Sequence, residues 1–180
     1  YIKAQNIGEI VAIVHSHTIG SPIASQADLV SCETHGIPWH IYSVPLNTWK
    51  SYKPSGYKAG LIGRQFHWGV LDCYSLVRDY YRQELNIELP DFKRTDEDIF
   101  KKGISLYEEK YIEAGFKKVS DIQKHDVIVM RIDGRFPAHA AIYLGDSLIL
   151  HHLRNRLSSR DNYGEFYRKN THHYFRHVSL

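Results

Sequence analysis

The spacing of apolar positions changes part-way along the C-terminal two-thirds of the chain. In residues 72–85, DCYSLVRDYYRQEL, apolar side chains recur every three or four positions, which predicts an amphipathic helix. A second helical stretch covers residues 105–114, and Gly115 is expected to end it. Short apolar runs separated by glycine-containing turns follow, and they predict strands at 126–132, 139–146, 147–153 and 173–178. Helices followed by antiparallel strands predict an α+β fold.

The N-terminal part has a different order of elements. The pattern predicts a strand at 10–14, a helix at 25–35 and a strand at 39–44, which are too few to form an independent core. Residues 45–60, PLNTWKSYKPSGYKAG, hold two prolines, two glycines and little apolar periodicity, and we interpret them as a linker. The chain would then consist of an N-terminal segment 1–44, a linker 45–60 and a domain 61–180.

Composition excludes several classes of protein. The 43% apolar and 24% charged residues are ordinary for a globular protein, and no apolar run approaches the length of a membrane span. A formal charge of +3 does not indicate a surface that binds nucleic acid. Two cysteines in 180 residues do not form a disulfide framework, so we expect synthesis in a reducing compartment. The chain opens with Tyr1 rather than Met, and we expect that its true N-terminus is missing.

Cys73 lies where nucleophilic cysteine chemistry is favoured. Asp72 is predicted to cap the helix, which puts Cys73 in the first turn, where the helix dipole favours a thiolate. His139 opens one predicted strand and His151 lies near the end of the next, so a turn at 145–146 would bring them side by side. His139 could then act as the base and His151 could orient it. Spacing alone leaves the alternative open that Cys73 is a buried apolar side chain and that the histidines are structural.

Two segments carry a specific resemblance. Residues 63–82, GRQFHWGVLDCYSLVRDYYR, resemble the cysteine motif of NlpC/P60 peptidases, especially the version found in phage tail assembly proteins. Residues 138–160, AHAAIYLGDSLILHHLRNRLSSR, resemble the histidine strand of the same family. The resemblance covers about residues 61–180. It implies a papain-like α+β fold, with N-terminal helices packed on an antiparallel sheet, and a catalytic set of Cys73, His139 and His151.

The same resemblance implies a substrate and a biological setting. NlpC/P60 peptidases hydrolyse peptide bonds in the stem peptides of bacterial peptidoglycan, and this chain is expected to do the same. The phage version implies synthesis in the host cytoplasm, assembly with other tail tip proteins in the virion, and action at the host cell wall. An assembly role with vestigial hydrolysis is the alternative.

Three positions qualify the resemblance. Phe66 occupies the place where many members carry a tyrosine that helps to stabilise the oxyanion, and phenylalanine has no hydroxyl to donate. The backbone N–H of Cys73 would carry more of that role. Asp72 matches the family's aspartate, which we interpret as structural. His152 is an alternative to His151, because a strand register can slip by one residue.

A second group of candidate site residues lies near the N-terminus. His15-Ser16-His17 ends a predicted strand, so both imidazoles should point to one face. Two histidines and the carboxylate of Asp28, with a fourth position open, suit a catalytic zinc ion. Ser25-x-x-Asp28 is also an acidic form of the helix capping box, which needs no metal. Spacing alone leaves both interpretations open.

The string HSHTIGSPIASQAD resembles the JAMM/MPN metallopeptidase signature. The implied zinc ligands are His15, His17 and Asp28. The resemblance further implies that Ser25 stabilises the tetrahedral intermediate and that residues 1–44 are the C-terminal part of an α/β JAMM domain. The catalytic glutamate of that family is expected before Tyr1, and Glu9, on the same predicted strand as His15, is not a substitute. We therefore expect that these residues can bind zinc but that this chain has no metallopeptidase activity. We expect Cys32 to pack in the interior rather than to bind metal.

Overall fold

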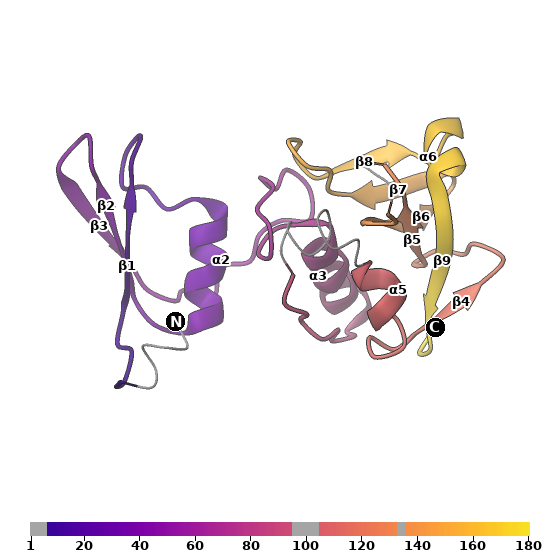
Figure 1. Ribbon diagram of the computed structural model, residues 1–180, viewed down its shortest axis with the longest axis horizontal. Coiled ribbons are helices and arrows are strands. Elements are labelled where there is room, and N and C mark those ends of the chain that lie inside the picture. Colours follow the sequence, from indigo (N-terminus) through magenta and orange to yellow (C-terminus); the bar gives the residue numbers. More distant parts are fainter. Residues whose placement is uncertain (1–6, 95–104, 133–135) are drawn as a thin grey trace. The chain divides into compact units, whose positions relative to one another are not determined.

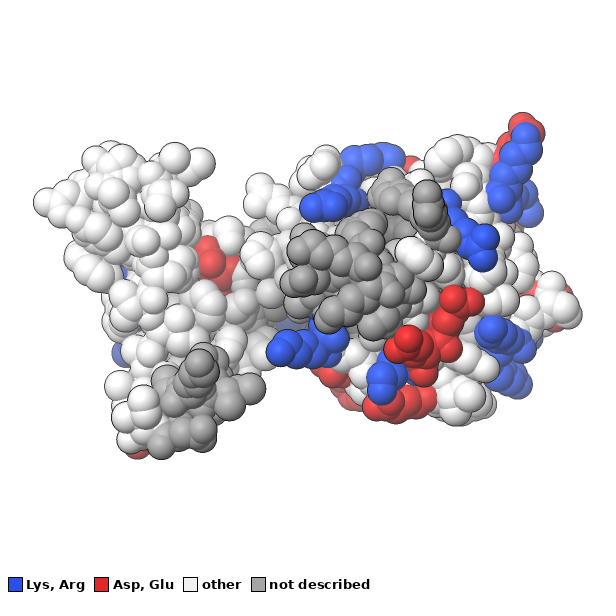
Figure 2. Space-filling model, viewed as in Figure 1, with Lys and Arg blue, Asp and Glu red and all other residues white. Residues whose placement is uncertain are grey.

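The computed structural model describes residues 7–94, 105–132 and 136–180 of the chain. It divides into two compact units, Tyr1–Ala59 and Gly60–Leu180 (Figure 1). No helix among the described residues is both long enough and apolar enough to cross a membrane. On the face drawn in Figure 2, the described acidic and basic side chains of the C-terminal unit are interspersed.

The N-terminal unit is a three-stranded sheet with one helix. Its elements are β1 (Ile13–His17), α2 (Gln26–His35), β2 (Trp39–Ser43) and β3 (Thr48–Tyr52). β1 and β2 run parallel, with α2 as the connection between them, and β3 pairs antiparallel with β2. Helix α2 begins at a capping box between Ser25 and Asp28 and ends at Gly36, whose φ of 68° suits glycine.

Two expectations for this unit need correction. The predicted linker 45–60 contains strand β3, which forms a hairpin with β2 after a turn at Asn47. The ring of Trp49 packs on Tyr42 at a centroid distance of 4.8 Å, so aromatic cross-strand packing stabilises a segment that lacks apolar alternation. Strand β1 also begins at Ile13 rather than residue 10, and Glu9 therefore lies outside it.

The C-terminal unit has an α+β fold, as the pattern predicts. Its elements are α3 (Cys73–Leu85), α5 (Leu106–Lys110), β4 (Phe116–Val119), β5 (Val127–Met130), β6 (His139–Gly145), β7 (Leu148–His151), β8 (Ser159–Asn162), α6 (Glu165–Asn170) and β9 (Thr171–His177). The strands form one antiparallel six-stranded sheet in the order β4-β9-β5-β6-β7-β8. The sequence pattern does not predict β4, β8 or α6, and α5 is shorter than the predicted helix 105–114.

Strand β5 is buried on both faces of this sheet. Val127 and Val129 pack in the cluster that contains α3, whereas Ile128 and Met130 pack on the opposite side with Tyr163. Because neighbouring side chains of a strand point to opposite faces, β5 contributes to two clusters at once. This explains why the sequence of β5 is continuously apolar rather than alternating. The two clusters hold the strands that carry the candidate site in place.

Helix α3 begins at a buried ion pair. Asp72 is its N-cap: the Asp72 carboxylate accepts from the backbone N–H of Ser75, as the sequence predicted. The Arg94 guanidinium contacts the same carboxylate through Nε at 2.6 Å and Nη2 at 3.0 Å. Burial alone would raise the pKa of Asp72, but Arg94 and the N–H donors outweigh burial and hold that pKa below its ordinary value.

Removal of Arg94 should therefore destabilise the C-terminal unit strongly. Arg94→Ala leaves the Asp72 carboxylate buried without its cation, and loss of one partner of a buried pair costs about 3–5 kcal/mol. Urea unfolding would measure this loss. The matched control is Lys169→Ala, which breaks an exposed ion pair with Glu165 and should change stability little. Equal unfolding midpoints for Arg94→Ala and the parent would show that the pair does not stabilise the helix start.

Candidate active site

Cys73 is the first residue of α3, so its backbone N–H belongs to the free N-terminal turn. Its sulfur lies 3.2 Å from the hydroxyl oxygen of Tyr107, which comes from α5. The carbonyl oxygen of Ala138, the residue before β6, lies 3.8 Å from the same sulfur. Only 6% of the Cys73 surface is exposed. The thiol is therefore at a helix start, as predicted, but it is enclosed by two other segments.

His139 and His151 are joined by a hydrogen bond. The distance between Nε2 of His139 and Nδ1 of His151 is 3.1 Å. Strands β6 and β7 form the predicted antiparallel hairpin, with Ala141 directly opposite His151, so the two histidines are diagonal neighbours on one face. Both side chains are buried. The pairing selects His151, and not the alternative His152, as the hydrogen-bond partner of His139.

A carboxylate continues this chain of contacts. Asp161 of β8 places Oδ2 3.1 Å from Nε2 of His151, and the Tyr167 hydroxyl of α6 donates to that same oxygen at 2.8 Å. Neither Asp161 nor Tyr167 was predicted from the sequence. Strand β8 is the polar run SRDN, which has no apolar alternation, so no periodicity marked Asp161 as part of a strand. Only the pairing of β8 with β7 places it beside His151.

Cys73 and His139 line one small cavity. Its other lining residues include Phe66, His152 and Arg154, and its volume is about 30 Å³. That volume holds a water molecule or two but not a peptide. A larger groove of about 610 Å³ shares Phe66, Trp68 and Arg154 with the cavity. The groove is of the size that ligand sites have, and its shared lining residues place it next to the cavity of the thiol.

Burial dominates the titration of this site. It raises the pKa of Cys73, and the nearby Asp72 charge raises that pKa further, against the lowering effect of the Tyr107 hydroxyl. Burial, with the neighbouring His151 and His152, lowers the pKa of His139 to about 3. The prediction that Cys73 is a thiolate is therefore wrong for this enclosed state. Desolvation outweighs the helix dipole, so a neutral thiol beside a neutral imidazole is favoured.

Within the described residues, no hydrogen bond joins Cys73 to His139. Since Nε2 of His139 is engaged by His151, Nδ1 is the nitrogen left to take a proton from the thiol. A neutral imidazole can accept that proton, and an imidazole hydrogen-bonded at its other nitrogen is held in orientation. The arrangement thus places a thiol and an imidazole on one cavity, with His151 hydrogen-bonded to that imidazole.

Known proteins are similar to this chain over most of its length. The profile described as NlpC/P60 family matches residues 63–176, which include Cys73, His139 and His151. The chain belongs to the NlpC/P60 family. It is homologous to tail tip assembly protein K of Escherichia phage lambda, with 38% identity over 179 residues, which cover 98% of this chain and 86% of the relative. Tail tip assembly protein K of Escherichia phage N15 is 34% identical over 174 residues, which cover 95% and 71% respectively.

A group that could hold a metal ion lies outside the NlpC/P60 match. His15, His17 and Asp28 each offer one ligand atom, and these atoms lie within 4.8 Å of one another. The Nε2 atoms of the two histidines are 3.3 Å apart, and each is 3.4 Å from a carboxylate oxygen of Asp28. Nδ1 of His17 bonds the Ser21 carbonyl, which orients the ring and leaves Nε2 as the ligand atom. Asp28 at the same time forms the capping box with Ser25, so the two interpretations of the motif are compatible.

Two further observations complete this N-terminal site. Cys32 is 2% exposed, and its sulfur lies 3.5 Å from the Ile37 carbonyl, in agreement with the packing role expected for it. Burial raises the pKa of its thiol. No comparison above tests the JAMM/MPN resemblance of residues 1–44, which stays a prediction.

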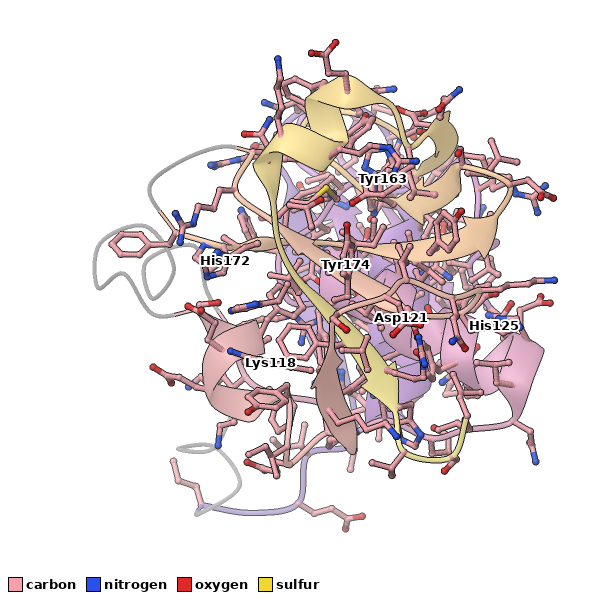
Figure 3. All side chains as sticks on the ribbon, turned by 90° about the vertical axis from the view of Figure 1, so that its right-hand side faces the viewer. Lys118, Asp121, His125, Tyr163, His172 and Tyr174 are labelled. Carbon is pink, nitrogen blue, oxygen red and sulfur yellow. The ribbon has the colours of Figure 1, made fainter. Side chains whose placement is uncertain are left out.

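A second cluster of potential ligands consists of Glu108, His172 and His173. A register shift between Val129 and Met130 lets the two consecutive histidines of β9 lie together rather than on opposite faces. Two cations already contact their rings: Lys118 Nζ is 3.1 Å from His173, and Arg131 Nη2 is 3.1 Å from His172. Figure 3 shows Lys118 and His172 on the same side of β9. We interpret this cluster as a network of hydrogen bonds and ion pairs.

The contact between Tyr107 and Cys73 has a measurable effect. Tyr107→Phe removes the hydroxyl that contacts the sulfur, so the pKa of Cys73 should rise. A hydrogen bond to a charged group contributes about 1.5–3 kcal/mol. Alkylation of Cys73 by iodoacetamide at neutral pH should therefore slow by about tenfold or more. The control is Tyr111→Phe, which removes a hydroxyl from the turn that follows α5. Unchanged alkylation of Tyr107→Phe would mean that the hydroxyl does not stabilise the thiolate.

Proposed function

We propose that this chain is a phage tail tip protein whose C-terminal domain is a cysteine peptidase of peptidoglycan stem peptides. The observation that carries the proposal is the shared cavity of Cys73 and His139, with His139 hydrogen-bonded to His151. Homology to two tail tip assembly proteins supports the setting. Within that setting the chain would be made in the host cytoplasm, join other tail tip proteins in the virion and act on the host cell wall.

The proposed reaction proceeds through a thioester. The sulfur of Cys73 attacks the carbonyl carbon of the scissile amide, and its proton passes to Nδ1 of His139. His139 returns the proton to the leaving amine nitrogen as the C–N bond breaks. Water then adds to the thioester, with His139 as base, and the C–S bond breaks to restore the thiol. The Cys73 backbone N–H supports the oxyanion, since Phe66 offers no hydroxyl.

Substrate access requires the small cavity to open. A stem peptide does not fit in about 30 Å³, so a peptide bound in the adjoining groove would have to displace side chains around Cys73. Arg154 lies over the Trp68 ring, 5.8 Å from its centroid, at the boundary between groove and cavity. Binding energy from the groove would then offset the cost of exposing the thiol.

A second candidate function is an assembly role without hydrolysis. The enclosed thiol, its raised pKa and the absence of a described hydrogen bond from Cys73 to His139 favour it. Under this alternative the site is a remnant that stabilises the fold. The two candidates differ in one result, namely whether the parent chain cleaves muropeptides.

We also propose that His15, His17 and Asp28 bind zinc. Two imidazole nitrogens and a carboxylate oxygen match the ligand set that zinc takes in hydrolytic sites, where it would polarise a bound water or carbonyl. In this proposal Ser25 Oγ, which donates to Asp28 at 2.8 Å, orients the carboxylate. To help stabilise an oxyanion, Ser25 would have to turn its single hydroxyl proton from Asp28 to the substrate. Zinc-dependent isopeptidase activity would need a general base, and none of the three ligands can serve as one.

Substitution of Cys73 tests the peptidase proposal. The parent chain should release peptide fragments from purified muropeptides, and Cys73→Ala and His139→Ala should each lower the rate to background, because the nucleophile or its base is gone. Liquid chromatography of the products measures the rate. Cys32→Ala is the matched control and should keep the parental rate. Hydrolysis by Cys73→Ala at the parental rate would refute the mechanism, and an inactive parent would favour the assembly role.

Substitution of Asp28 tests zinc binding. Titration calorimetry with Zn²⁺ should give one site per chain, and Asp28→Asn should weaken its affinity by about 10–100-fold or more because a charged ligand is lost. The asparagine carbonyl can still accept from the Ser25 backbone N–H, which helps to preserve the capping box of α2. Glu108→Gln changes the other histidine cluster and should leave the affinity unchanged. If only Glu108→Gln weakens binding, the zinc ion lies at β9 instead.

A further inference from the structure

We propose that Asp161 is a positioning residue that fixes the protons of the His139–His151 pair so that Nδ1 of His139 is free to act as base. The proposal deepens the proposed peptidase function and rests on it. Asp161 belongs to none of the sequence motifs that mark the site. Its place in the site comes from the pairing of β8 with β7 and from the contact of its Oδ2 with Nε2 of His151 at 3.1 Å.

Two neutral imidazoles in series have a choice of proton arrangement. Each ring carries one N–H and one unprotonated nitrogen, and a single hydrogen bond joins Nε2 of His139 to Nδ1 of His151. If His139 donates, its Nδ1 is unprotonated and basic. If His151 donates instead, the proton of His139 lies on Nδ1, and that nitrogen cannot accept a proton from Cys73. The hydrogen bond between the rings is equally satisfied in both arrangements.

Asp161 removes this choice. A carboxylate can only accept, so its contact with His151 requires the His151 proton to be on Nε2. Nδ1 of His151 is then unprotonated and must accept from Nε2–H of His139. The remaining nitrogen of His139, Nδ1, carries a lone pair. One carboxylate thus sets the proton positions of two rings, and the effect reaches the nitrogen left for the cysteine.

The carboxylate is itself held in place by donors. The Tyr167 hydroxyl donates to Oδ2 at 2.8 Å, the Ser159 hydroxyl donates to Oδ1 at 2.9 Å, and Arg156 Nη2 is 3.4 Å from Oδ2. Against the raising effect of burial, the hydrogen bonds from Tyr167, His151 and Ser159 lower the pKa of Asp161 to about 2, so it is ionised at any pH at which the domain would work. The Asp161 side chain is 22% exposed while that of His151 is 1% exposed, so the charge is only partly screened.

The charged groups around the histidines agree with this role. His139 faces His151 and His152, which further disfavour its protonated form, and its own pKa of about 3 keeps it neutral at rest. His151 faces Asp161, which favours its protonated form, and Arg156, which opposes it, and burial keeps its pKa below the ordinary value. Both rings are therefore neutral near pH 7. Tautomer rather than charge is what Asp161 selects.

Nitrogen-15 NMR of the parent chain tests the proposal directly. Long-range ¹H–¹⁵N spectra of histidine-labelled protein distinguish the two tautomers of each ring. We expect His139 and His151 both to carry the proton on Nε2 at pH 7. A parent protein in which either ring carries it on Nδ1 overturns the proposal, and this measurement needs neither substrate nor variant.

Asp161→Asn tests the consequence for catalysis. An asparagine amide can donate to Nε2 of His151, which reverses the proton order and moves the His139 proton to Nδ1. We expect kcat for muropeptides to fall by about 10–100-fold with little change in KM, and the tautomer signals of both rings to change together. Tyr167→Phe removes one donor but leaves the carboxylate, so a smaller loss is expected. The control Asp146→Asn lies in the exposed β6–β7 turn and should keep the parental kcat and tautomers.

The outcomes separate this proposal from the peptidase function. If the parent chain hydrolyses no muropeptide, the proposed function fails, while the NMR tautomers still decide the role of Asp161. If the parent is active and Asp161→Asn retains its kcat, the positioning role is wrong and the peptidase proposal stands. A fall in kcat with unchanged tautomers, in a variant whose circular dichroism matches the parent, reduces Asp161 to a structural residue and overturns the proposal.

Discussion

The buried pairing of Asp72 with Arg94 is the interaction on which the rest of the candidate site depends. One carboxylate caps helix α3 and, through Arg94, ties that helix start to the segment after it. Cys73 is the next residue, so the cap fixes where its sulfur and its backbone N–H point. The cost of desolvating two charges is offset only by close hydrogen bonding, and the short contacts at Asp72 supply it. A side chain directly beside such a pair has little freedom to move.

Sequence patterns predicted the part of the site that lies on periodic elements. Cys73 begins a helix with clear apolar periodicity, His139 begins a short apolar run, and the hairpin between β6 and β7 followed from its turn residues. Asp161 and Tyr107 could not be found in this way. Asp161 lies in a polar edge strand, and Tyr107 looks like any aromatic residue of a short helix. Both matter through contacts between residues far apart in the chain, and such contacts leave no local periodicity.

The same distinction explains why the predicted charge state of Cys73 was wrong. A helix start and a nearby imidazole are local features, and both favour a thiolate. Exposure is a property of the whole fold, and here the Cys73 thiol and the His139 ring are nearly closed off from water. Desolvation then favours the neutral forms of both groups. Under the proposed function, the reactivity of Cys73 would therefore depend on the opening of its cavity.

Asp28 joins two roles that are usually separate. Its carboxylate completes the cap of helix α2 and also faces the Nε2 atoms of His15 and His17. A divalent ion bound there would attach the first turn of the helix to the end of strand β1. Ligand binding to the folded state adds to its stability through mass action. The stability of the folded N-terminal unit would then increase with the free zinc concentration. The same polypeptide would be more resistant to unfolding in a metal-rich compartment than in a metal-poor one.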